Sequence, residues 1–251
     1  TFWAKTSPIL FPIVGTLKED TYLYNSKAYN LPRHGFARDM EFEVTESAKD
    51  FAVFTLTSSP ASIGKYPFEF RLQVRYKLKG NSLHVNYAVG NEGTGEMYFS
   101  IGGHPAFKVP LIDGTRYEDY YLMFNKVEEA PRWPISDKGL IETNPAVFIN
   151  NTNKIQLNRK IFEQDAIVLK HLHSDCVSIR SFKHDHGLDF YFEGFPFFGI
   201  WAAKNADFVC LEPWCGIADT VNHNQELTRK EGIEKIGAGE SWSREWKVVL
   251  Y

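Results

Sequence analysis

The sequence predicts an all-β protein, organised as a large sandwich or barrel of antiparallel β-strands, and three observations support this fold class. Apolar and polar residues alternate with a period of two over long stretches, which is typical of strands with one buried and one solvent-exposed face. Strand-like stretches recur at intervals of about ten residues, with turn residues between them. No stretch carries a helical period over three or more turns.

The first part of the chain, residues 1–40, is punctuated by proline and glycine, which interrupt helices. Two short strands are expected at residues 21–24 and 27–29, joined by a tight turn. A polar loop, residues 31–39, follows them and carries Arg33, His34 and Arg38. Loops held by rigid strands are where binding groups collect, although an ordinary surface loop would have the same composition.

The middle of the chain has the clearest strand signal. Residues 41–44 alternate, and residues 51–57 form a more apolar strand. Along residues 68–78 the even-numbered positions are aliphatic or aromatic and the odd-numbered ones are polar, and residues 83–89 repeat this pattern after a turn. This pattern predicts an antiparallel pair with one buried face.

A second histidine follows the next expected strand. The stretch Met97–Phe107 begins as a strand and is expected to turn at Gly102-Gly103, so that it presents His104 ahead of Pro105. A histidine at the end of a strand can point into a cleft, or it can simply cap the strand.

The second half of the chain continues the strand pattern less regularly. Asp165 stands directly before an apolar strand, and the apolar strand of residues 208–211 is expected to end at Glu212-Pro213-Trp214. A short segment around residues 225–230 is the one moderate helix candidate. Further strands are expected at residues 120–124, 146–149, 154–157, 177–182, 188–192, 197–202 and 241–251.

The composition limits the classes of function. The chain has 251 residues, 15% of them aromatic, and a net charge of −3 without a basic run, so no nucleic-acid partner is expected. No apolar stretch approaches the ~20 residues of a membrane helix, and no signal peptide is visible, so we expect a cytoplasmic protein that does not contact a membrane. No linker-like composition appears, and residues 1–251 are expected to form a single domain. The oligomeric state is left open, with a homodimer as one option.

Four polar groups beside aromatic residues are candidates for chemistry: His34, His104, Asp165 and Glu212. Glu212 adjoins an apolar run, so we expect it to be partly desolvated, which raises the pKa of a carboxyl group and makes it a better base near neutrality. The alternative is a structural ion pair between Glu212 and an arginine.

Other chemistries lack their usual patterns. The three cysteines, Cys176, Cys210 and Cys215, form no CxxC pair, and the histidines and carboxylates do not follow metal-ligand spacing, so no metal is expected. No glycine-rich nucleotide loop and no serine-hydrolase motif occur. Acid–base catalysis without a cofactor, by one histidine and one carboxylate, remains.

Four blocks of sequence resemble the aldose 1-epimerase (galactose mutarotase) superfamily, in the same order: residues 10–15, LFPIVG; 31–38, LPRHGFAR; 101–107, IGGHPAF; and 211–214, LEPW. The LacX-like branch is the most similar. The resemblance implies the galactose mutarotase-like supersandwich. It also implies cofactor-free interconversion of the α and β anomers of a galactose- or glucose-type hexose, or of its phosphate.

The resemblance also implies roles for individual residues. Glu212 would take the proton from the C1 hydroxyl, and His104 would protonate the ring oxygen as the sugar ring opens. His34 and Asp165 would bind the sugar. Contacts with the sugar ring are implied for Trp3, Phe36, Phe107 and Trp214.

Two departures from the family pattern affect these expectations. Thr16 stands where many members have an arginine, and Lys18 is expected to lie on the same strand face and to substitute for it, although a lysine lacks the bidentate fork. Family members also carry strands ahead of the Phe2-Trp3 of this chain, which starts with Thr1, so we expect that a segment is missing and a sheet edge is exposed.

Several alternatives stay open on the sequence. Lys18, Arg33 and Arg38 would suit a sugar phosphate, or would equally be solvated surface charges. A non-catalytic carbohydrate-binding module would share the scaffold. A glycoside hydrolase would use Asp165 and Glu212 as its two carboxylates.

Overall fold

The computed structural model describes residues 3–251, so Phe2 of the resemblance lies outside the described residues. The strands of the first half are β1 (Ile9–Leu10), β2 (Thr21–Tyr24), β3 (Lys27–Asn30), β4 (Glu43–Ser47), β5 (Phe51–Thr57), β6 (Phe70–Lys79), β7 (Ser82–Asn91), β8 (Met97–Phe99), β9 (Ile101–Gly103) and β10 (Ala106–Lys108). Those of the second half are β11 (Tyr120–Arg132), β12 (Ala146–Gln156), β13 (Ile167–Lys170), β14 (Cys176–Ser181), β15 (Leu188–Tyr191), β16 (Phe197–Trp201), β17 (Phe208–Cys215), β18 (Glu234–Ile236) and β19 (Ser241–Leu250).

Helical structure within the described part of the chain is slight. It comprises α1 (Pro60–Ile63) and the 3-10 turns η1 (Lys18–Asp20), η2 (Ala37–Asp39), η3 (Tyr117–Asp119), η4 (Arg159–Phe162) and η5 (Leu227–Arg229). The helix expected around residues 225–230 is therefore only the turn η5. No helix among residues 3–251 is long and apolar enough to cross a membrane.

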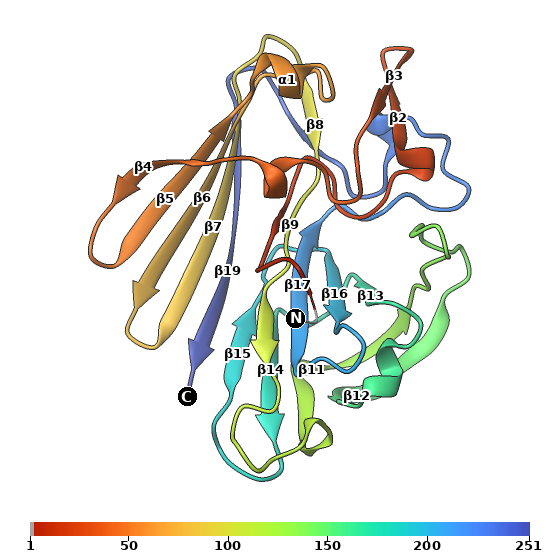
Figure 1. Cartoon of the computed structure of the whole chain (residues 1–251). Coiled ribbons are helices and arrows are strands. Elements are labelled where there is room, and N and C mark those ends of the chain that lie inside the picture. Colours follow the sequence, from red (N-terminus) through yellow and green to blue (C-terminus); the bar gives the residue numbers. More distant parts are fainter. Residues whose placement is uncertain (1–2) are drawn as a thin grey trace.

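Two antiparallel sheets form the body of the molecule (Figure 1). The smaller one has six strands in the order β1-β9-β17-β16-β13, with β10 also paired to β17. The larger one has nine strands in the order β12-β11-β14-β15-β19-β7-β6-β5-β4. The predicted all-β fold class is confirmed. The strand β4, at one end of the larger sheet, is exposed at all five of its residues.

The core lies between the two sheets. The period of two in β6 and β7 buries Leu72 and Val89, which are paired across the hairpin. Aromatic rings meet across the sheets: Phe198 of β16 lies 4.3 Å from Phe192, measured between ring centroids, and 6.0 Å from Phe190 of β15. Burial of such rings is the main stabilising term of the sandwich.

The six-stranded sheet is covered on both faces. In β17, Val209 and Leu211 belong to the core between the sheets, whereas Trp214 belongs to a second apolar cluster on the opposite face. A strand that is covered on both faces shows no clear alternation of apolar and polar residues. For this reason the C-terminal end of β17 was predicted wrongly from the sequence pattern. The strand continues through Glu212 and Pro213 to Cys215.

A gap between β9 and β10 explains how a proline fits in this central strand. The N–H of Leu211 donates to Pro105 between those two strands, and the nitrogen of Pro213, two residues on, faces the same side. The missing N–H of Pro213 therefore removes no ladder bond to β16. His104 lies in this gap, beside the middle of β17.

The two glycines ahead of His104 do not turn the chain. Gly102 and Gly103 lie inside β9, paired with β1, and neither has a positive φ. A Cβ on Gly102 would lie 2.5 Å from the ring of Trp214, and one on Gly103 would lie 2.7 Å from the hydroxyl of Tyr87. The expected turn is thus wrong, because these glycines make room for large side chains on both faces of the sheet.

Candidate active site

A cavity of about 390 Å³ lies over the outer face of the six-stranded sheet, a volume in the range that suits a small ligand. Its floor comes from β13 and β17, through Val168, Glu212 and Trp214. Its walls come from loops that follow β1, β11 and β17. The wall residues are Val14, Gly15, Ile135, Gly139, Ile141, Ile217 and Ala218.

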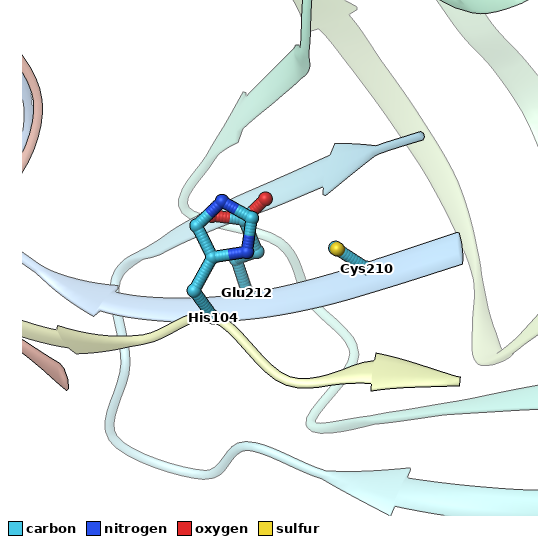
Figure 2. Close-up of side chains that lie close together, drawn as sticks. All are labelled: His104, Cys210 and Glu212. Atoms are coloured by element: carbon cyan, nitrogen blue, oxygen red, sulfur yellow. The ribbon is translucent and has the colours of Figure 1, made fainter. Parts of the chain in front are cut away.

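His104 and Glu212 meet at this cavity (Figure 2). Nε2 of His104 lies 3.3 Å from Oε2 of Glu212, and the two side chains are only 11% and 2% exposed. The two groups are therefore in contact with each other on one side of the cavity.

Burial shifts the pKa values of the two groups in opposite directions. It raises the pKa of Glu212 well above the ordinary carboxyl value, an effect that the charge of Arg33 partly offsets. It lowers the pKa of His104 to about 4, well below the value of free histidine. Between these two pKa values the pair holds one proton.

Aromatic rings enclose His104. The ring of Trp3 lies 4.7 Å from that of His104, and the ring of Trp201 lies 5.6 Å away in an edge-on arrangement. Trp3 was a candidate from the sequence, whereas Trp201 was missed; Trp201 reaches the site because it pairs with Cys210 where β16 lies beside β17. The expected ring contacts Phe36 and Phe107 do not line the cavity.

Trp214 lies in the cavity floor and is 6% exposed. Its indole ring spreads over two neighbouring strands, where Gly102 of β9 and Gly199 of β16 leave space for it; a Cβ on Gly199 would lie 2.4 Å from the ring. Sequence adjacency to Glu212 pointed to this tryptophan, but the two glycines that accommodate it come from strands distant in sequence.

His34 lines the cavity from the loop ahead of η2. Its Nδ1 accepts a hydrogen bond of 3.1 Å from the backbone N–H of Gly15. Burial lowers the pKa of His34 well below its usual value, so the ring is neutral and carries its proton on Nε2. His34 can therefore donate one hydrogen bond from Nε2 to a ligand oxygen.

The charged residues at the cavity are Arg33, Arg38 and Asp165. Arg33 lies 3.8 Å from a carboxylate oxygen of Asp165, and both side chains are more than a third exposed. Arg38 is more buried, at 20%, and its Nε has no hydrogen-bond partner. Asp165 precedes β13 as expected and accepts a hydrogen bond from the N–H of Ala166.

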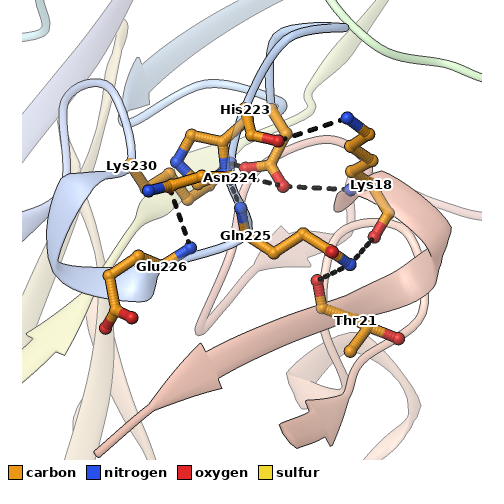
Figure 3. Close-up of polar contacts among 8 residues, drawn as sticks. Lys18, Thr21, His223, Asn224, Gln225, Glu226 and Lys230 are labelled. Atoms are coloured by element: carbon orange, nitrogen blue, oxygen red, sulfur yellow. Dashed lines mark hydrogen bonds and ion pairs between the residues drawn. The ribbon is translucent and has the colours of Figure 1, made fainter. Parts of the chain in front are cut away.

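Lys18 does not belong to this group. It lies in η1 rather than in a strand, and its ammonium donates to the backbone oxygen of His223, 3.3 Å away (Figure 3). It does not line the cavity. The proposal that Lys18 replaces the family arginine at Thr16 is therefore wrong, because the 3-10 turn rotates its side chain away from the face on which a strand would have placed it.

A buried ion pair lies behind the part of the cavity wall that the loops after β1 and β17 form. Nζ of Lys230 lies 2.8 Å from Oδ1 of Asp219, and the two side chains are 1% and 0% exposed. The other oxygen of Asp219 accepts from the backbone N–H of Lys18, and the backbone N–H of Asp219 donates to Thr16. The pair thus joins the loop after β1 to the loop after β17, both of which line the cavity.

The sequence is similar to those of a known protein family. A sequence model of the aldose 1-epimerase family matches residues 3–233. The plasmid and chromosomal LacX proteins of Lactococcus lactis subsp. lactis are each 34% identical to this chain over 245 residues, covering 94% of this chain and 82% of the relative.

Solved structures show the same fold. A galactose mutarotase related enzyme from Lactobacillus acidophilus matches with a TM-score of 0.94 at 33% identity, over 99% of this chain and 84% of that one. A galactose mutarotase-like protein from Lactobacillus casei matches with a TM-score of 0.92 at 29% identity, over 100% of this chain and 86% of that one. The match to the family model, together with these relatives, shows that the chain belongs to the aldose 1-epimerase family, in the LacX-like branch.

Proposed function

We propose that this protein interconverts the α and β anomers of a galactose- or glucose-type hexose by acid–base catalysis, without a cofactor. The observation that carries the proposal is the contact between His104 and Glu212, two proton-transfer groups buried in one cavity large enough for a hexose. Family membership supports a sugar-directed isomerase of the mutarotase type.

The closeness of the two groups suits the reaction. Ring opening delivers a proton to O5 and removes one from the C1 hydroxyl, and both oxygens are bonded to the same carbon, C1. An acid and a base 3.3 Å apart can therefore reach both oxygens from one side of the sugar. Facing groups on opposite walls are not required.

The proton count balances over a turnover. The acid gives its proton to O5 as the C1–O5 bond breaks, and the base takes the C1 hydroxyl proton as the aldehyde forms. Rotation about C1–C2 then presents the other face of the aldehyde, and closure of the ring returns both protons. A pair that holds one proton serves both directions, because opening and closing exchange the two roles.

The resemblance assigns the base to Glu212 and the acid to His104, which pairs a carboxylate with an imidazolium, whereas burial disfavours the charged form of each group and so favours the arrangement without charges. Both arrangements contain the same number of protons. We propose that the proton passes across the 3.3 Å contact, so that either arrangement is reached from the other without exchange with solvent.

The remaining residues would hold the sugar. The Nε2–H of His34 would donate to a sugar oxygen, and Asp165 would accept from hydroxyl groups. Trp3, Trp201 and Trp214 supply apolar surface for the C–H faces of a pyranose. Arg33 and Arg38 would also accommodate a phosphate, so a hexose 6-phosphate is included among the substrates to be tested.

Polarimetry tests the proposal. Freshly dissolved α-D-galactose, α-D-glucose and α-D-glucose 6-phosphate should reach rotational equilibrium faster with the protein than in buffer alone. Glu212→Gln and His104→Asn should each reduce the acceleration by ~10²–10⁴-fold. Lack of acceleration with all three sugars would contradict the proposal.

A sugar-binding module without catalysis is the second candidate. It is favoured by Thr16, the departure from the family pattern, because the ammonium of Lys18 donates to His223 and does not replace the family arginine. Sugar binding measured by calorimetry, with no acceleration of mutarotation, would support the module. Release of reducing sugar from an aryl glycoside would instead indicate a hydrolase that uses Asp165 and Glu212.

A further inference from the structure

A cysteine lies beside the catalytic pair. Cys210 stands two residues before Glu212 in β17, so both side chains leave the same face of the strand. His104 joins them from the gap between β9 and β10 (Figure 2). One ring nitrogen of His104, Sγ of Cys210 and one carboxylate oxygen of Glu212 all lie within 4.8 Å of one another.

A second observation marks the cluster as a ligand site. Nδ1 of His104 is buried and has no hydrogen-bond partner among residues 3–251, in a residue that is only 8% exposed. Buried polar atoms normally have a partner, so an orphaned nitrogen here signals a missing one. Imidazole nitrogen is also a preferred ligand of zinc-like cations.

We propose that His104, Cys210 and Glu212 form a binding site for a divalent cation of the zinc class, and that its occupancy inhibits the protein. One sulfur, one nitrogen and one oxygen donor are the ligand types that Zn²⁺ takes in proteins, and three protein ligands leave a fourth position for water. The cavity gives the cation a route to the site, because His104 and Glu212 line it.

Binding requires two adjustments. Zinc–ligand bonds are about 2.0–2.3 Å long, so donors up to 4.8 Å apart must close by roughly an ångström. The thiol of Cys210 must also lose its proton as its sulfur bonds to the metal, and the His104–Glu212 pair must lose the one proton that it holds; both protons are released to solvent. No electron transfer and no further reactant is involved.

The inhibitory effect rests on the proposed function. A bound cation takes the lone pairs of His104 and Glu212 that proton transfer needs. Cys210 itself has no role in the proposed reaction. Its replacement should therefore remove sensitivity to the metal while leaving catalysis unchanged.

Cobalt titration tests the site directly. Co²⁺ added to the full chain should give a sulfur-to-cobalt charge-transfer band that saturates at one equivalent and is competed away by Zn²⁺. Cys210→Ala should abolish this band. Cys176→Ala is the matched control, because Cys176 is also buried but lies in β14 of the other sheet, and it should leave the band unchanged.

A band that persists in Cys210→Ala, or no band in the wild-type protein, would overturn the proposal. Cys210→Ser, which keeps the size of the side chain, provides a second variant with the same predicted loss if the alanine variant does not fold. Circular dichroism of each variant verifies the fold before titration.

A measurement of activity tests whether the bound cation inhibits the protein. Zn²⁺ should slow mutarotation by the wild-type protein at least tenfold, a chelator should reverse this, and Cys210→Ala should keep its basal rate while losing the inhibition. The two proposals fail separately. A cobalt band without mutarotase activity overturns the proposed function alone, whereas activity that is insensitive to Zn²⁺ and shows no band overturns the metal site alone.

Discussion

Burial decides the chemistry of the individual site residues. Glu212 is 2% exposed and has its pKa raised, while His104 has its pKa lowered to about 4. Sequence position alone suggested desolvation for Glu212, because it adjoins an apolar run. It could not suggest the same for His104, whose burial depends on Trp3 and Trp201 from other parts of the chain.

The pH dependence of catalysis follows from these shifts. As the pH falls through about 4, His104 gains a proton and the pair then lacks a base, so kcat/KM for the α-hexose should fall there. As the pH rises through the elevated pKa of Glu212, the pair loses its only proton and the rate should fall again. A pH–rate profile whose acid limb lies near 6.5, the value of free histidine, would contradict this account.

His34 is expected to affect sugar binding more than the chemical step. Its Nδ1 is held by Gly15, so its Nε2–H is fixed as a donor toward the cavity. His34→Ala should therefore raise KM by on the order of tenfold, the cost of one buried hydrogen bond, with a smaller change in kcat. Steady-state kinetics on the variant checks this, and a loss confined to kcat would argue against the binding role.

At the scale of elements, the gap between β9 and β10 places the histidine against the middle of β17. Four sequence blocks pointed to the correct segments, and Asp165 lies ahead of its strand as predicted. The predictions for the interiors of β9 and β17 were wrong, because a turn was expected in the first and a strand end in the second. In a local sequence pattern, glycine and proline indicate turns. Here Gly102 instead leaves space for the ring of Trp214, and the nitrogen of Pro213 faces the side of β17 where the pairing with β9 and β10 is interrupted.

Gly102→Ala tests that role. Its Cβ would lie 2.5 Å from the Trp214 ring, so the variant should lose about 1–3 kcal/mol of stability through overpacking. The midpoint of urea unfolding measures the loss. Gly95→Ala is the control, because nothing lies within 4 Å of its Cβ position, and it should change the midpoint little. Equal midpoints for both variants would show that Gly102 serves no packing role.

The buried pair behind the cavity wall is a second test at this scale. Lys230→Met would leave the carboxylate of Asp219 buried without its ammonium partner, and the loss of one partner typically costs about 3–5 kcal/mol. Denaturant unfolding measures the loss. Lys235→Met, which breaks the exposed pair with Glu96, is the control and should change stability by less than about 1 kcal/mol.

At the scale of the whole molecule, the nine-stranded sheet takes strands from both halves of the sequence. β7 from the first half pairs with β19 at the C-terminus, and β19 in turn pairs with β15. The alternating pattern predicted each strand of the β6–β7 hairpin, but no local pattern could predict this long-range pairing. The same limit applies to the metal site, since spacing along the chain separates His104 from Cys210 while the fold joins them.

This mixing of halves supports the prediction that residues 1–251 form one domain. Separation of the two halves would break the β7–β19 ladder, so neither half should unfold alone. Calorimetry should show one thermal transition whose calorimetric and van't Hoff enthalpies agree. Two resolved transitions would contradict the prediction.

The central claim is that His104 and Glu212 act as one unit that shares a proton. The most direct measurement is the exchange rate between galactose anomers at equilibrium, obtained by NMR for the wild-type protein, for Glu212→Gln, for His104→Asn and for the double variant. The account predicts that each single variant loses ~10²–10⁴-fold of the acceleration and that the double variant loses no more than the worse single one. Losses that multiply in the double variant would show that the two groups act independently and would contradict the account.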